Sequence, residues 1–209
     1  MIQNLKNTLR DNLSFLIPFA VVWIVAFIFA LLQTKAETHL IINEYHATWA
    51  DYFFRYFTQI GGFIPWILIA VIFFIRYRIG LLLLTTQLVT GLFTQILKHI
   101  FAVVRPSVLL TQLGYTYHTI EGVSLHTINS FPSGHTASAF AMMFVISIIC
   151  KKNWQKVLCL IVAYLAGFSR IYLSQHFLQD VLAGSVIGIL SVLFVYEIQL
   201  KVLPKHTPQ

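Results

Sequence analysis

The sequence contains few charged residues. Only 10% of its 209 residues are Asp, Glu, Lys or Arg, whereas 58% are hydrophobic, and the mean hydropathy is +0.79. Soluble globular domains have about 25% charged residues. Because one soluble core of this size cannot bury so much apolar surface, the composition excludes an ordinary soluble domain and predicts a membrane protein.

Cysteine is also scarce, and the chain has no internal repeat, low-complexity tract or interdomain linker. The two cysteines, Cys150 and Cys159, fall in or beside apolar segments. Free cysteine behaves as a small buried apolar residue, so we interpret both as packing residues and not as a disulfide or a metal site. The chain is therefore predicted to form a single membrane domain over residues 1–209.

Six apolar stretches approach the length that crosses a bilayer, which is roughly 20 residues in a helix. They are residues 14–33, 62–75, 79–101, 134–150, 154–168 and 181–200. Backbone groups in hydrocarbon need internal partners, which favours helices, and the alternation typical of a membrane barrel is missing. The first stretch is too long for a cleaved signal peptide and has no small-residue cleavage site after it. The predicted fold is an all-α integral membrane bundle of six transmembrane helices.

The net charge of +7 would suit either nucleic acid or a membrane surface as partner. In membrane proteins, basic residues concentrate in cytoplasmic loops. If six helices alternate in direction, nine basic residues fall at one face: Lys6, Arg10, Arg76, Arg78, Lys151, Lys152, Lys156, Lys201 and Lys205. We therefore predict that this face and both termini are cytoplasmic, and we do not expect nucleic acid as a partner.

Three polar clusters lie at the opposite, outer face: KHIFAVVRP at 98–106, PSGH at 132–135 and SRIYLSQHFLQD at 169–180. A Lys, Arg or Asp at the bilayer centre costs roughly 2.5–3.5 kcal/mol on insertion scales, so such residues usually serve a purpose. Lys98 and Arg105 are seven residues apart, which is two helical turns and nearly the same azimuth. Pro106 predicts that the helix ends at Arg105. The alternative is a pair of snorkelling residues at a helix end.

The other two clusters each allow a functional and a structural interpretation. Ser133 can cap a helix that begins near Gly134, and the free N–H groups and positive dipole of such a helix start suit an anion. A capped helix start with a solvated His135 is the alternative. His176 and Asp180 are four residues apart and hence neighbours on one helical face. A carboxylate on one ring nitrogen makes the other more basic, as in an activated nucleophile or base, although a polar pair at a helix start is equally consistent.

Arg170 lies six residues before His176, in the short outer loop. Three cations, a helix N-terminus and two histidines at one membrane face describe a phosphate site. Phosphoryl transfer requires positioning and charge stabilisation, for which arginine supplies a planar fork and lysine a point charge. The residues alone leave open which histidine attacks, and they identify no partner for His39.

The order of these motifs, K-x6-RP, then PSGH, then SR-x5-H-x3-D, resembles the type 2 phosphatidic acid phosphatase superfamily. Relatives in that superfamily include glucose-6-phosphatase and the vanadium haloperoxidases. The match covers residues 98–180, and no motif position departs from the pattern. The joint match is highly specific, although each part alone is not.

The resemblance implies a set of residues that bind the phosphate oxygens. These are Lys98, Arg105, Ser133, Gly134 and Arg170. The resemblance implies no metal and no other cofactor, because the protein's own cations take that place.

The resemblance also implies three catalytic residues. His176 would attack phosphorus and form a phosphohistidine. Asp180 would orient His176 and balance its charge. His135 would protonate the leaving oxygen and then help to activate water for the second step.

The predicted activity is hydrolysis of a lipid phosphomonoester or diphosphate at the outer leaflet. The short chain resembles the bacterial members of the family, which implies an inner (plasma) membrane with the active site on its periplasmic or extracellular face, among membrane lipids. Candidate substrates are undecaprenyl diphosphate, phosphatidylglycerophosphate, phosphatidate and a lipid A phosphate, and we favour a polyprenyl diphosphate because carrier recycling is a widespread need. The alternatives are a non-catalytic transporter or phosphate-binding protein, and a haem-binding electron carrier, which would need two facing histidines.

A long outer connection, residues 107–130, links the first two clusters. Loops of this length are often functional. The candidates for contact with a headgroup are Tyr115, Tyr117, His118, Glu121 and His126, and an interfacial lid is the alternative.

Overall fold

The computed structural model describes residues 2–202, and every regular element in this part of the chain is helical. In chain order the elements are α1 (Ile2–Asp11), α2 (Leu13–Leu32), α3 (Lys35–Glu44), α4 (Thr48–Phe57), the 3-10 turn η1 (Thr58–Ile60), α5 (Ile64–Ile75), α6 (Tyr77–Phe101), α7 (Pro106–Gln112), α8 (Gly134–Ile149), α9 (Asn153–Tyr172) and α10 (Leu178–Val202). The all-α prediction is confirmed. Lys205, one of the nine basic residues of the predicted cytoplasmic face, lies outside the described residues.

Each of the six apolar stretches coincides with a helix. Four helical segments within residues 2–202 are long and apolar enough to cross a membrane: α2, the segment Tyr77–Gln112 that contains α6 and α7, α9 and α10. The number is five if α4, η1 and α5, which bend by 43° at a short break, form one span. Helix α8 has only 16 residues. Four or five membrane spans therefore have direct support, and the sixth stays a prediction.

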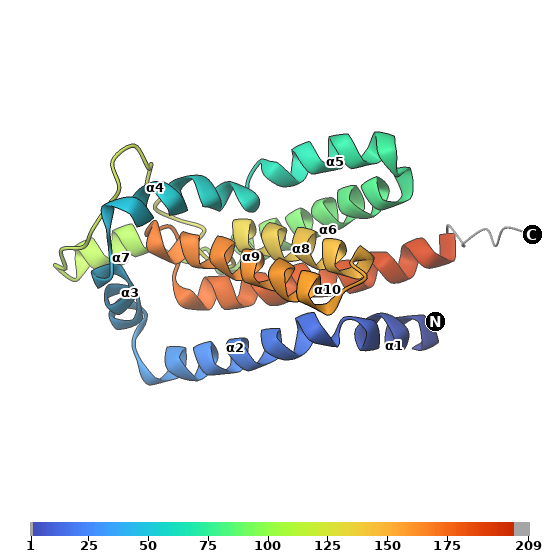
Figure 1. Cartoon of the computed structure of the whole chain (residues 1–209). Helices are drawn as coiled ribbons and strands as arrows, with labels where there is room; N and C mark the ends of the chain where they lie inside the picture. The colour runs from blue at the N-terminus through green and yellow to red at the C-terminus, as the bar shows by residue number, and fades with distance from the viewer. Residues whose placement is uncertain (1, 203–209) are drawn as a thin grey trace, which may run out of the picture.

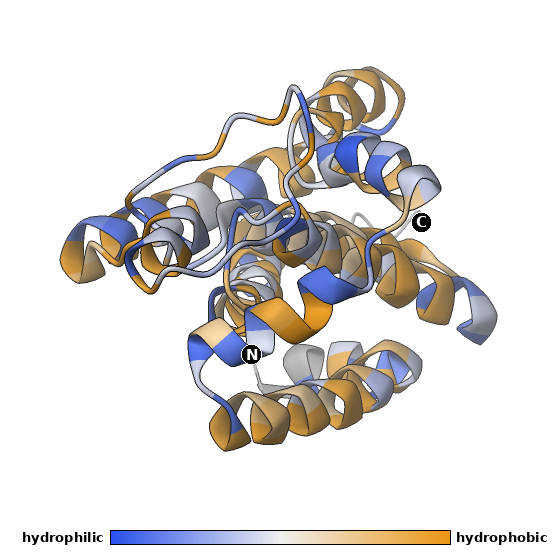
Figure 2. Cartoon of the chain, turned by 90° about the vertical axis from the view of Figure 1, so that its left-hand side faces the viewer, coloured by the Kyte–Doolittle hydropathy of each residue, from blue (hydrophilic) through white to orange (hydrophobic). Residues whose placement is uncertain are grey.

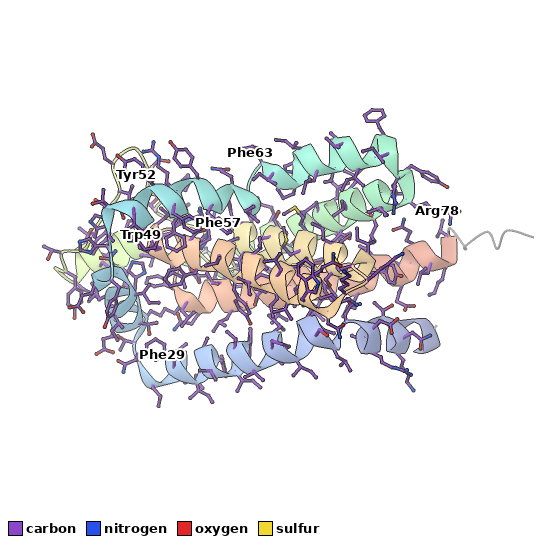
Figure 3. The ribbon with its side chains drawn as sticks, viewed as in Figure 1. Phe29, Trp49, Tyr52, Phe57, Phe63 and Arg78 are labelled. Atoms are coloured by element: carbon purple, nitrogen blue, oxygen red, sulfur yellow. The ribbon has the colours of Figure 1, made fainter. Side chains whose placement is uncertain are left out.

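The long helices run side by side along one axis, and α3 and α7 lie at one end of the bundle (Figure 1). Helix α1 and the last turn of α10 lie at the opposite end. Arg78 also projects from that opposite end (Figure 3). Both ends of the described chain are therefore on the same side of the bundle, which is what an even number of crossings requires.

Helix α8 forms the centre of the bundle. It packs against α6, α9 and α10, and Phe140, Phe144 and Val145 are fully buried. Phe15 of α2 packs on Phe144 with ring centroids 5.0 Å apart. Burial of a large apolar side chain contributes about 1.5–3 kcal/mol, so these residues anchor the helix whose first turn carries the PSGH motif.

Two glycines of α10 allow it to approach the start of α8. A Cβ on Gly184 would lie 2.5 Å from Ser133 O, and a Cβ on Gly188 would lie 2.4 Å from Ala137 O. Contacts this short are repulsive, so any larger residue would push the two helices apart. The glycines thus hold the first turn of α8 against α10, close to the His176–Asp180 motif.

The outward-facing surface of the bundle is apolar. Val25, Leu31 and Phe74 are 63%, 69% and 90% exposed, respectively. Seen from the end that carries α3 and α7, hydrophobic residues dominate the helices at the periphery (Figure 2). Extensive exposed apolar surface marks contact with a membrane or another apolar partner, and its distribution around the helices fits lipid.

Candidate active site

The three polar clusters meet at the end of the bundle where α6 and α9 finish and α8 and α10 begin (Figure 1). Ser133 N donates to Asp180 O at 3.0 Å, which joins the second cluster to the third. Arg105 Nη1 donates to Gln175 O at 2.9 Å, which joins the first cluster to the third. Residues that are as many as 70 positions apart in the sequence are therefore joined in one site.

His176 and Asp180 form the buried centre of the site. His176 Nδ1 donates to Asp180 Oδ2 at 3.4 Å, and the two residues are 2% and 0% exposed. The sequence analysis expected this contact between neighbours on one helical face. In the structure Asp180 lies in the first turn of α10, whereas His176 precedes that helix, so the two residues do not share a helical face. The same carboxylate oxygen accepts bonds from Ser130 Oγ at 2.5 Å and Phe177 N at 2.9 Å. The carboxylate is thereby fixed, and Nε2 is the ring nitrogen left for a substrate.

Burial lowers the pKa of His176 to about 4. The hydrogen bond to Asp180 acts in the opposite direction, and the charges of Arg170 and Arg105 lower the pKa further. Because desolvation disfavours the cationic ring, His176 is neutral near neutral pH. A neutral ring has a lone pair on Nε2, which a nucleophile or a base requires.

Lys98 and Arg105 do not share a helical face, so that part of the sequence analysis is wrong. Helix α6 ends at Phe101, and Ala102 follows with a φ of 44° in the left-handed region. Arg105 is extended, with φ −88° and ψ 165°, and it precedes α7, which Pro106 begins. Pro106 does bar helix at Arg105, but the chain leaves α6 one turn earlier than expected.

Arg105 is held in place by backbone carbonyl groups. Besides the bond to Gln175 O, its Nε donates to Ile128 O at 2.9 Å and its Nη2 lies 3.5 Å from Asn129 O. The side chain is 7% exposed. A guanidinium group has five N–H donors, so N–H groups remain to donate to an anion from a fixed position.

The start of α8 faces the first cluster. Ser133 Oγ accepts a hydrogen bond from Thr136 N at 3.4 Å, which makes Ser133 the predicted N-cap. A Cβ built on Gly134 would lie 3.9 Å from Lys98 Nζ, so the ammonium group sits beside the helix start. A lysine charge and a helix N-terminus at one place attract an anion.

Arg170 lies in the last turn of α9, and not in the outer loop where the sequence analysis placed it, because α9 continues to Tyr172. Its Nη1 donates to Thr58 Oγ1 at 2.7 Å. Its Nε has no partner among the described residues. Lys98 is close enough to Arg105 and Arg170 for their charges to interact with its ammonium group. The three cations therefore form one group.

His135 lies in the first turn of α8, against the break between η1 and α5. A Cβ on Gly62 would lie 3.3 Å from His135 Nε2, and a Cβ on Gly61 would lie 2.0 Å from His135 O. The backbone of the break can approach the histidine only because both positions are glycine. The charges of His176, Arg170, Lys98 and Arg105 act on His135, so it belongs to the same group.

Three residues that support the site were missed by the sequence analysis. Thr58 binds Arg170, Ser130 binds Asp180, and Gln175 binds Arg105 through its backbone oxygen. Ser130 lies two residues before Pro132 of the PSGH motif, and Gln175 directly precedes His176. Their positions in the sequence therefore gave a signal that could have identified them. Thr58 is distant in sequence from every motif, so only the folded chain reveals its role.

The second half of the outer connection packs against the site. Arg105 N donates to Thr127 O, and Ser130 N donates to Val103 O, each at 2.9 Å. Burial lowers the pKa of His126, and the charges of Arg105, Arg170 and Lys98 lower it further, so His126 lies at the edge of the cation group.

The first half of the connection contacts α3 and α4 instead of the site. His118 Nε2 donates to Asp51 Oδ2 at 3.0 Å, and Arg55 Nη1 donates to Glu121 O at 3.1 Å. The ring of Tyr117 packs against the ring of His39 at 6.5 Å, and Tyr115 is 45% exposed. Of the five headgroup candidates, His126 therefore lies nearest to the cations that are predicted to bind phosphate.

Comparison with protein families matches the chain to the PAP2 superfamily over residues 79–203. This range is more than half of the chain and includes every predicted site residue. The resemblance inferred from the motifs is confirmed.

Individual relatives agree with this match. The bacitracin transport permease protein BcrC of Bacillus licheniformis is 45% identical over 69 residues, which span 32% of this chain and 32% of BcrC. The lipid A 4'-phosphatase of Porphyromonas gingivalis is 26% identical over 181 residues, or 81% of this chain and 75% of that protein. Among solved structures, LpxE of Aquifex aeolicus superposes with a TM-score of 0.68 at 29% identity, over 77% of this chain and 93% of LpxE.

Proposed function

The chain belongs to the PAP2 superfamily, and on this premise we propose that it is an integral-membrane lipid phosphatase that works through a phosphohistidine. The observation that carries the proposal is the buried His176–Asp180 pair, which lies beside a group of three cations at the start of a helix. A neutral, oriented imidazole next to a phosphate-binding site has the two properties that nucleophilic attack on phosphorus requires.

In the first stage, the cations bind the phosphate of the substrate. Arg105 and Arg170 are held by Gln175, Ile128 and Thr58 in fixed orientations. Fixed N–H donors stabilise charge on the equatorial oxygens without reorganising during the reaction. The ammonium of Lys98 and the N–H groups at the start of α8 supply further positive charge.

In the second stage, His176 Nε2 attacks phosphorus as the bond from phosphorus to the lipid oxygen breaks. His135, which must enter this step as the imidazolium, donates a proton to that oxygen and becomes neutral, so the lipid leaves as an alcohol or, from a diphosphate, as a monophosphate. The ring of His176 becomes cationic when the N–P bond forms, and the carboxylate of Asp180 balances this charge. His135 then accepts a proton from water, the water oxygen bonds to phosphorus, the N–P bond breaks, and His176 is neutral again.

The substrate is a phosphorylated lipid at the outer leaflet. Two lipid A 4'-phosphatases are among the relatives that match over most of this chain, which supports a lipid A phosphate as the first candidate. Undecaprenyl diphosphate, phosphatidylglycerophosphate and phosphatidate remain the comparison substrates, because the same cations suit any lipid phosphate.

The proposed membrane arrangement has six spans in one domain over residues 1–209. The termini face the cytoplasm, and the site faces the outside of a bacterial inner membrane. It is supported by the position of α1, Arg78 and the end of α10 at the end of the bundle opposite the site (Figures 1 and 3). Basic residues favour the cytoplasmic side of a membrane.

A second candidate is transport or binding without catalysis. It is favoured by the similarity to BcrC, whose name describes a transport permease. Hydrolysis separates the two functions, because a transporter would move or bind a phosphorylated lipid without releasing phosphate.

The test is phosphate release by purified protein in detergent from a panel of lipid phosphates, followed by rapid quenching with a labelled substrate. We expect label on His176, no turnover and no label in His176→Ala, and slow turnover with some trapped phosphohistidine in His135→Ala. Label on His135 in the native protein would reverse the two roles. Binding of every lipid in the panel without phosphate release would favour transport.

A further inference from the structure

The loop that carries His176 is braced by a helix outside the segment that matches the PAP2 family. Residues 173–177 connect α9 to α10, and they pack beside α3. His39 of α3 is 1% exposed, and its Nε2 shares a hydrogen bond of 3.1 Å with Ser174 Oγ. The sequence analysis found no partner for His39, because Ser174 is 135 residues away.

The same helix also contacts the residue that follows His176. The ring of His39 packs edge to face on Phe177, with centroids 5.9 Å apart and an interplanar angle of 76°. Lys35 Nζ lies 5.9 Å from the centroid of the same Phe177 ring. Phe177 N in turn donates to Asp180 Oδ2, the oxygen that accepts from His176. Helix α3 therefore holds the chain on both sides of His176.

The conformation of Ser174 explains why this loop needs a brace. Its φ is 53°, in the left-handed region that residues with a Cβ rarely adopt. Such a conformation costs roughly 1–2 kcal/mol and persists only where the surroundings fix it. Ser174 N donates to Ile171 O at 2.9 Å, and the hydroxyl bond to His39 is the second polar contact that fixes this residue.

We propose that His39 is a positioning residue for the nucleophile: its bond to Ser174 and its contact with Phe177 set the direction in which His176 Nε2 faces phosphorus. This inference rests on the proposed function, because it assumes that His176 attacks. In-line attack requires the reacting atoms to be about 3–3.5 Å apart and aligned, so a small tilt of the loop slows the reaction.

Burial lowers the pKa of His39 to about 4, so the ring is neutral at neutral pH. Its effect on His176 is therefore transmitted by hydrogen bonding and packing, and not by charge. His39 Nδ1 has no partner among the described residues, so Ser174 is the polar contact that holds the ring in place.

The experiment compares His39→Phe with His39→Gln. Phenylalanine keeps an aromatic ring on Phe177 but removes the bond to Ser174, whereas the amide nitrogen of glutamine can replace Nε2. We expect kcat for lipid phosphate hydrolysis to fall about fivefold in His39→Phe, which corresponds to about 1 kcal/mol, with KM unchanged. We expect His39→Gln to recover most of that loss.

Two inhibitors separate positioning from general damage. Orthophosphate binding depends on the cations, whereas vanadate, as a pentacoordinate mimic, also depends on the placement of His176. His39→Phe should weaken vanadate inhibition about fivefold, in line with its lower transition-state stabilisation, and leave orthophosphate inhibition unchanged. Equal weakening of both inhibitors would show that the whole site has been damaged and would overturn the proposal.

Thr38→Val is the matched control, because Thr38 is also 1% exposed on α3 and its hydroxyl has no partner within the described residues. It should have native kcat. Ser174→Ala should lose as much as His39→Phe, and the double variant should lose no more than either alone. Native kcat in His39→Phe alongside an active native protein would overturn the role of His39. Failure of the native protein both to release phosphate and to bind vanadate would instead overturn the proposed function, and this inference with it.

Discussion

Replacement of Arg105 by lysine keeps the positive charge but removes the planar guanidinium group. In the native structure, Nε donates to Ile128 O and Nη1 donates to Gln175 O, both at 2.9 Å. The contacts to Gln175 Oε1 and Asn129 O, at 3.4 and 3.5 Å, are too long to contribute much. Because the side chain is 7% exposed, water cannot easily replace a lost bond.

A lysine ammonium group can reach one of the two carbonyl groups, but it cannot span both and also make two directed bonds to phosphate. A hydrogen bond from a charged donor contributes about 1.5–3 kcal/mol. Loss of one bond to a carbonyl and one to phosphate therefore costs about 3 kcal/mol at the lower end of that range. Since each 1.36 kcal/mol changes the rate tenfold, we expect Arg105→Lys to lower kcat/KM about 100-fold.

The assay is steady-state phosphate release from a lipid phosphate by purified protein in detergent, with thermal unfolding as a check that the variant is folded. Arg55→Lys is the control, because Arg55 lies on the same outer side but bonds to Glu121 O of the outer connection. Near-normal turnover in Arg105→Lys would refute this reasoning and would leave Arg105 as a snorkelling residue that only affects topology.

Four further outcomes are expected. Asp180→Asn should bind orthophosphate normally but lose most of kcat, because a buried amide cannot balance the charge on His176. Calorimetry measures the orthophosphate binding and steady-state kinetics measure kcat, and a native kcat would contradict the prediction. Burial lowers the pKa of His39 and His176 to about 4, whereas each ring takes up a proton near pH 6.5 in the unfolded chain. The free energy of unfolding should therefore fall as the pH drops from about 6.5 to about 4. A flat profile of unfolding temperature across this range would show that these rings are not buried as neutral groups. Hydrolysis should survive EDTA and be inhibited by vanadate, because the cations of the protein act in place of a metal; complete loss in EDTA that magnesium restores would overturn that mechanism. A cysteine at Ser107, in a chain whose own cysteines are replaced, should react with an impermeant thiol reagent from outside the cell, and labelling only from the cytoplasmic side would overturn the topology.

The sequence by itself determined the class of the protein and its family. Apolar stretches near bilayer length leave helices as the structure that satisfies backbone groups in lipid, and all six stretches are helical. The three motifs resembled one family, and the family match over residues 79–203 agrees. These inferences succeeded because they depend on local composition and on residue order, which the sequence contains directly.

Only the tertiary structure decided how those residues meet and what supports them. Helix α6 ends at Phe101, where the apolar stretch ends, and not at Arg105 as Pro106 suggested, whereas α9 continues to Tyr172, one turn beyond its apolar stretch. Hydropathy averages over many residues, whereas the end of a helix depends on the conformation of single residues, such as Leu173, which follows α9 with a φ of −77° and a ψ of 9°. The partners Thr58 and His39 come from helices far away in sequence. A hydrogen bond between residues more than 100 positions apart leaves no local pattern, because it exists only after packing has brought the two side chains together.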